Sequence, residues 1–170
     1  MKKTMIMLCL ALVSWGANAQ HNHGGQAVQQ EIIQTKPLFK SKEVTKAYQA
    51  YLDVKDALIA AEAGKAQKAA QSLLKTLKKM DNSEQARAEA AIIASSTSLG
   101  AQRKSFAALS DEMTALVKNG QLSMGVVYVH FCPMANGLTG ANWLSSQQEI
   151  VNPYMGENMK KCGSVKETIQ

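Results

Sequence analysis

The chain has 170 residues, which is enough for one domain with a sizeable core. Hydrophobic residues make up 46% and charged residues 19%, so the composition excludes a disordered chain. Aromatic residues make up only 5%, which favours helices over a β-sandwich. The formal net charge is +6, but the only arginines are Arg87 and Arg103, so the chain lacks the arginine cluster expected of a nucleic-acid-binding surface.

The first 19 residues have the pattern of an export signal. Lys2 and Lys3 precede an apolar run over residues 4–16, and Ala17-Asn18-Ala19 places small residues where a signal peptidase requires them. The run is shorter than the roughly 20 residues that a membrane-spanning helix needs. We therefore predict cleavage after Ala19 and a periplasmic protein that is not inserted in the membrane.

Residues 20–40 are predicted to form a flexible tail, because they are polar, rich in glycine and interrupted by Pro37. His21 and His23 lie beside the new amino terminus, where they could hold Cu(II) or Ni(II) loosely. A solvated tail without metal is the favoured interpretation.

From residue 41 the sequence predicts a single helical-bundle domain that extends to residue 170. Apolar side chains recur at the helical period from Lys42 to Gly120, with breaks near Gly64, at residues 81–83 and at Gly100. Four amphipathic helices with short connections predict an all-α fold, an antiparallel four-helix bundle. Residues 121–170 are predicted to add a small C-terminal lobe made of an extended segment, a loop and a short helix.

The predicted lobe begins with a β-branched and aromatic segment, residues 124–134. Pro133 favours extended geometry for the residue before it. Side chains alternate along an extended chain, so three metal-binding side chains would share one side: His130, Cys132 and Met134. Residues 135–148 are predicted to form a loop.

A short helix is predicted after that loop. Asn152 suits a helix cap, Pro153 the first helical position and Gly163 the position just past the end. On such a helix three sulfur-bearing side chains would share a face, at i, i+4 and i+7: Met155, Met159 and Cys162.

Together the two elements predict a soft-metal site. Thiolates and thioethers suit Cu(I) and Ag(I) better than Mg(II) or Ca(II). Structural zinc fits poorly, since only two cysteines and one histidine are available near the site. The predicted ligands are Cys132, Met134, Met159 and Cys162, with His130 and Met155 as additional candidates.

The alternative is a disulfide between Cys132 and Cys162, the two cysteines that remain after export to an oxidising compartment. On the chain-entropy model such a bridge would stabilise the fold by roughly 3–4 kcal/mol. The two interpretations are compatible, because sulfurs close enough to form a bridge when oxidised can hold one ion when reduced.

The C-terminal motifs also carry a resemblance. They comprise Cys132-Pro133-Met134-Ala135, Gly140-Ala141-Asn142-Trp143-Leu144-Ser145, Asn152-Pro153-Tyr154, Met159 and Cys162-Gly163, with Gln102-Arg103, Phe106 and Met113 upstream. From about Leu38 to Gln170 the chain resembles the domain-of-unknown-function family DUF3347. The resemblance implies small exported domains, also found fused to CusB-type adaptors of copper and silver efflux pumps. It implies metal handling at Cys132, Met134, Met159 and Cys162.

Three functional hypotheses follow. The leading one is a periplasmic Cu(I) or Ag(I) protein that buffers the metal or hands it to an efflux adaptor. The second is an envelope interaction module without metal, stapled by a Cys132–Cys162 disulfide. An enzyme using Cys132 and His130 is disfavoured, because no orienting acid lies nearby in the sequence and no nucleophile elbow or phosphate-binding loop is present.

Overall fold

Residues 36–170 are described by the structure, a computed structural model. The predicted signal peptide and residues 20–35 of the predicted tail lie outside the described residues. The end of that predicted tail contains a short strand, β1 (Leu38–Phe39). No helix within residues 36–170 combines the length and apolarity needed to cross a membrane.

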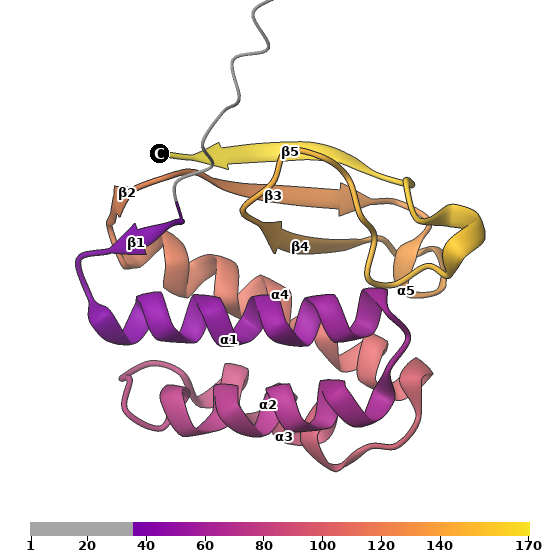
Figure 1. Cartoon of the computed structure of the whole chain (residues 1–170), viewed down its shortest axis with the longest axis horizontal. Helices are drawn as coiled ribbons and strands as arrows, with labels where there is room; N and C mark the ends of the chain where they lie inside the picture. The colour runs from indigo at the N-terminus through magenta and orange to yellow at the C-terminus, as the bar shows by residue number, and fades with distance from the viewer. Residues whose placement is uncertain (1–35) are drawn as a thin grey trace, which may run out of the picture. The chain divides into compact units, whose positions relative to one another are not determined.

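The four predicted helices are confirmed. Their bounds are α1 (Lys42–Ile59), α2 (Ala63–Leu77), α3 (Glu84–Ser95) and α4 (Leu99–Asn119). Each helix packs on the next in sequence, and α4 also packs on α1, so this part of the chain is bundle-like. Helices α1 and α4 lie between the strands and the pair formed by α2 and α3 (Figure 1).

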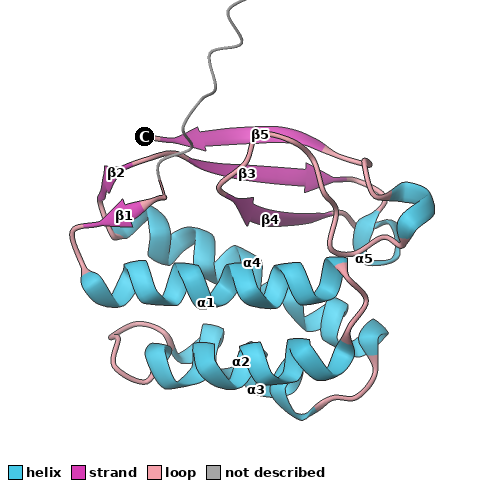
Figure 2. Ribbon diagram, in the orientation of Figure 1, coloured by secondary structure: helices cyan, strands magenta, loops and turns pink. Residues whose placement is uncertain are grey.

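The predicted all-α fold class is wrong, because the chain after α4 forms sheets and the fold is mixed α/β (Figure 2). Strand β1 pairs with β2 (Leu122–Met124) in a two-stranded antiparallel sheet. A second antiparallel sheet has the order β4-β3-β5. Its strands are β3 (Val127–Cys132), β4 (Ala141–Ser145) and β5 (Ser164–Ile169).

The extended segment was predicted correctly as β3, but its partners were not. Strand β4 lies inside the predicted loop, after a short helix, α5 (Ala135–Leu138). Strand β5 is almost entirely exposed, so it carries no alternation of buried and exposed residues. Its pairing with β3 comes from backbone hydrogen bonds between residues far apart in sequence, which a local hydrophobic pattern does not reveal.

The predicted short helix after Pro153 is also wrong. Only one turn of 3-10 helix forms there, η1 (Glu157–Met159). The Asn152 side chain does not cap a helix that continues to Cys162. Its Oδ1 accepts hydrogen bonds from the backbone N–H groups of Tyr154 and Met155, which turns the chain back locally.

A buried hydrogen-bond network joins the helices to the larger sheet. The Tyr51 hydroxyl of α1 lies 2.7 Å from the Ser110 hydroxyl of α4 and accepts a 3.1 Å bond from the Leu144 N–H of β4. The Tyr51 ring stacks on Phe106, with centroids 5.0 Å apart. Burial raises the pKa of Tyr51 well above its usual range, so the hydroxyl stays neutral and can donate.

Replacing Tyr51 by phenylalanine tests this network. We expect Tyr51→Phe to lower the free energy of unfolding by about 1–3 kcal/mol, because the Leu144 N–H loses its acceptor in a buried position. Urea denaturation followed by circular dichroism measures the change. Tyr128→Phe is the matched control, since Tyr128 is half-buried and its hydroxyl bonds no described residue. Equal stability of the two variants would contradict the assignment.

Candidate functional site

The two described cysteines lie side by side. Cys132 is buried at the end of β3, and Cys162 is partly exposed in the segment between η1 and β5. Their Sγ atoms are 2.7 Å apart, although the residues are 30 positions apart in sequence, and both thiols are free. The structure therefore places the two thiols of the candidate site in direct contact.

Asn152 holds the segment that carries Cys162. Its side chain is fully buried, and its Nδ2 donates a 2.8 Å hydrogen bond to the Cys162 carbonyl. Its backbone N–H donates to the Lys160 carbonyl at 2.8 Å. The Cys162 N–H in turn donates to the Met159 carbonyl at 3.0 Å. Through its side chain and its backbone N–H, Asn152 thus fixes the backbone at Cys162 and two residues before it.

Gly163 allows the chain to pass close to β3 immediately after Cys162. Its φ of +139° is unfavourable for residues with a side chain. A Cβ atom there would lie 2.9 Å from the Phe131 carbonyl oxygen and 2.9 Å from the Trp143 ring. Glycine is therefore required for the approach that brings the two thiols together.

The three candidate methionines are divided between two places. Met134 and Met155 line one groove of about 500 Å³, together with residues of α4 and α5. Neither cysteine lines that groove. Met159 lies in η1, three residues before Cys162. The predicted helical face shared by Met155, Met159 and Cys162 does not exist, because the helix is absent.

His130 occupies an apolar position on β3. It is fully buried, its ring centroid lies 5.3 Å from that of Trp143, and neither ring nitrogen has a hydrogen-bond partner among the described residues. Burial, assisted by the positive charge of Lys55, lowers the pKa of His130 to about 4. The imidazole is therefore neutral at physiological pH, which is the form that can ligate a metal.

The contact between the two sulfurs affects how readily the Cys162 thiol loses its proton. The hydrogen bond with Cys132 is the main cause that raises the pKa of the Cys162 thiol, and desolvation adds to it. A metal ion must therefore displace a proton to bind a thiolate here. Within residues 36–170, no three or more His, Cys, Asp or Glu side chains gather so as to hold a metal ion.

One residue that matters for the site, Arg103, was not among the predicted site residues. The Arg103 Nε donates to the Pro153 carbonyl at 2.9 Å, and its guanidinium also donates to the Leu58 carbonyl at 3.0 Å. Arg103 thus ties the loop that carries Met155 to α1 and α4. Nothing in the helical periodicity distinguishes it from a solvated surface arginine.

Comparison with known proteins gives one match. Residues 47–125 match the model of the family described as "Protein of unknown function (DUF3347)", and over these residues the chain belongs to that family. The match ends before β3, so it includes neither the two cysteines nor the rest of the candidate site. No curated protein and no solved structure matches the chain.

Replacing Gly163 by alanine tests the close approach. We expect Gly163→Ala to destabilise the protein by about 1–3 kcal/mol through backbone strain and to slow disulfide formation by a mild oxidant. Denaturant titration and thiol counting measure the two effects. Gly156→Ala is the matched control, because a Cβ there meets nothing within 4 Å. Unchanged stability and unchanged disulfide formation in Gly163→Ala would contradict the close approach of this backbone to Phe131 and Trp143.

The buried His130 makes stability depend on pH. Its pKa is about 4 in the folded state and about 6.5 when exposed, so its contribution is fully present above about pH 6.5 and is lost as the pH falls toward 4. When the pH is lowered from about 7.5 to about 5, the free energy of unfolding of the metal-free wild type should fall. In metal-free His130→Phe the fall should be smaller by about 2 kcal/mol. Urea titrations at the two pH values measure the difference. Parallel losses in both proteins would refute a buried neutral imidazole.

Proposed function

We propose that this member of the DUF3347 family binds Cu(I) or Ag(I) through Cys132 and Cys162 in the periplasm, and buffers the metal or passes it to an efflux system. The observation that carries the proposal is the 2.7 Å contact between the two sulfur atoms. Two thiolates supply the soft donors that monovalent copper and silver prefer. The transfer to an efflux adaptor is supported by the sequence resemblance alone.

Binding an ion between the sulfurs requires a small movement. With metal–sulfur bonds of about 2.3 Å, the two sulfurs must lie roughly 4 Å apart. Cys132 is buried on a central strand, whereas Cys162 is partly exposed in an irregular segment. The Cys162 side chain is therefore the one that rotates outward, and Met159, in the preceding turn, is the thioether closest to it along the chain.

The chemistry proposed is ligand exchange without catalysis. A partly exposed thiolate can be shared with an incoming donor or acceptor, so the metal can pass between proteins without being released. Because the pKa of Cys162 is raised, binding releases protons, and affinity should increase with pH.

The same sulfur contact favours a second candidate, a module for protein interaction that is stapled by a Cys132–Cys162 disulfide. Oxidation would join the end of β3 to the segment that precedes β5. The oxidised form could not bind metal through these sulfurs. Counting reactive thiols in protein purified without reductant distinguishes a permanent staple from a reduced pair.

The metal proposal is tested by titrating reduced protein with Cu(I) against a colorimetric chelator. We expect one tightly bound ion per chain in the wild type, and a loss of at least tenfold in affinity in Cys162→Ser, which removes a partly exposed donor. Cys132→Ser should have a similar effect. Ser164→Ala is the matched control, because this exposed residue lies two positions from Cys162 and carries no sulfur.

Circular dichroism of each variant confirms that it is folded before affinity is compared. Wild-type affinity in both cysteine variants would contradict the site. Absence of binding by the reduced wild type would leave the disulfide-stapled module as the better proposal.

A further inference from the structure

We propose that the groove lined by Met134 and Met155 is an entry site for anionic thiolate complexes of Cu(I) or Ag(I), of small-molecule size, from which the metal moves to the cysteine pair. This inference rests on the proposed function and adds the form in which the metal arrives. It also assigns different roles to the two kinds of sulfur: the thioethers of the groove receive the metal, and the thiols hold it afterwards.

The groove has the size and the donors for such a ligand. Its volume of about 500 Å³ lies in the range of small-molecule sites. Met134, at the start of α5, is 43% exposed, so its side chain can be reached from solvent. Met155 lines the same groove, so two thioether side chains border one ligand-sized space.

The charge of the groove selects against a bare metal cation. Arg103 and Lys104 line it, and its lining contains no aspartate or glutamate. Neither cation forms an ion pair within residues 36–170. A bare Cu(I) ion would be repelled, whereas a complex that carries thiolates and carboxylates would be attracted.

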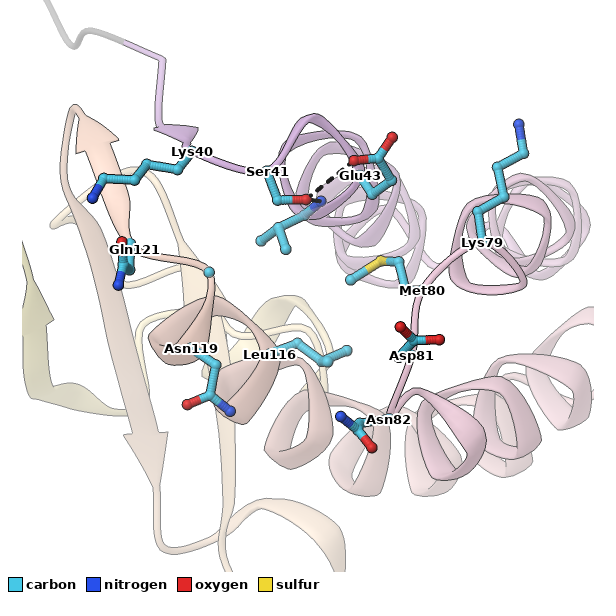
Figure 3. A pocket seen from close by; sticks show the side chains of 12 residues that line it. Lys40, Ser41, Glu43, Lys79, Met80, Asp81, Asn82, Leu116, Asn119 and Gln121 are labelled. Carbon is cyan, nitrogen blue, oxygen red and sulfur yellow. Dashed lines mark hydrogen bonds between the residues drawn. The ribbon is translucent and has the colours of Figure 1, made fainter.

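The other described grooves lack this combination. The groove between the start of α1 and the ends of α2 and α4 contains one methionine, and its two lysines are balanced by Glu43 and Asp81 (Figure 3). A third, smaller groove is lined by Lys55, Asp56 and Glu149 and contains no sulfur. Of the three grooves described, the groove of Met134 and Met155 is the one that joins two thioethers to an unbalanced positive charge.

The groove also adjoins the thiols along the chain. Met134 follows Cys132 by two residues, where β3 ends. Met155 donates its backbone N–H to the Asn152 side chain, and the same side chain holds the Cys162 carbonyl. Both groove methionines therefore belong to the segments that lead to or from the cysteines, Met134 directly after β3 and Met155 on the turn that Asn152 ties to Cys162.

The transfer involves no change of oxidation state. The bond between Cu(I) and the donor thiolate breaks, and a bond between Cu(I) and a cysteine sulfur forms, with the thioethers holding the ion in between. The proton displaced from the cysteine thiol moves to the departing thiolate, which leaves as a thiol. No oxidant or reductant is needed.

The first test measures transfer kinetics by stopped flow, with Cu(I)–glutathione as the anionic donor and Cu(I)–acetonitrile as the cationic one. Lys104→Gln should slow transfer from the glutathione complex about threefold at low salt and leave the acetonitrile rate unchanged or faster. Lys46→Gln, at an exposed residue outside the groove, is the matched control. Equal effects of Lys104→Gln on both donors would overturn the proposal.

The second test removes the thiols. A Cys132→Ser/Cys162→Ser variant should still bind Cu(I)–glutathione weakly and saturably, and adding Met134→Leu/Met155→Leu should abolish that binding. Met124→Leu replaces a methionine that is 51% exposed and outside the groove, so it should have no effect. No binding by the thiol-free variant would overturn the entry site while leaving the cysteine site intact. Failure of the cysteine site would instead appear as unchanged Cu(I) affinity in the single cysteine variants.

Discussion

The buried amide of Asn152 is the interaction on which the candidate site depends. Its oxygen accepts from the N–H groups of Tyr154 and Met155, and its nitrogen donates to the Cys162 carbonyl. A buried amide must satisfy its donors and acceptor, and here three of these bonds go to backbone groups that no regular element pairs. The chain between β4 and β5 therefore follows an irregular path in which η1 is the one helical turn. This path places Met155 at the groove and Cys162 against Cys132.

The helical half of the fold could be predicted because its signals are local. Apolar side chains at the helical period lie on faces that α1 to α4 bury, and the predicted breaks fall at or near the helix ends. The sheet could not be predicted in the same way. Strand β4 is a run of only five residues, and in β5 only Ile169 is partly buried. Their pairing depends on contacts across the chain that periodicity does not encode.

For the candidate site, the sequence indicated which residue types could bind metal, but it did not predict how their side chains are arranged in space. An even pair of cysteines in a chain with an export-like leader pointed to thiols that can meet, and Cys132 and Cys162 do meet. The expected grouping of Met155 and Met159 with Cys162 depended on a helix that does not form. Asn152 and Gly163 fit helix-end signals in the sequence, yet they act as a turn former and as a close-packed glycine. A cap residue and a turn residue look alike in sequence, because both bond neighbouring backbone N–H groups.

Because β5 is an exposed edge strand that follows Cys162, the state of the cysteine pair affects how easily β5 detaches from β3. Strand β5 is joined to the rest of the chain by its ladder with β3 and by an exposed ion pair, Lys118 with Glu167. An edge strand with so little buried surface is the first part of a sheet to fray. Fraying would leave β3, with Val127 and Val129, as a bare edge open to strand addition. A bridging ion or a sulfur–sulfur bond between Cys132 and Cys162 would fix the chain just before β5. The segment that can detach would then be shorter, and β5 would remain paired with the edge of β3.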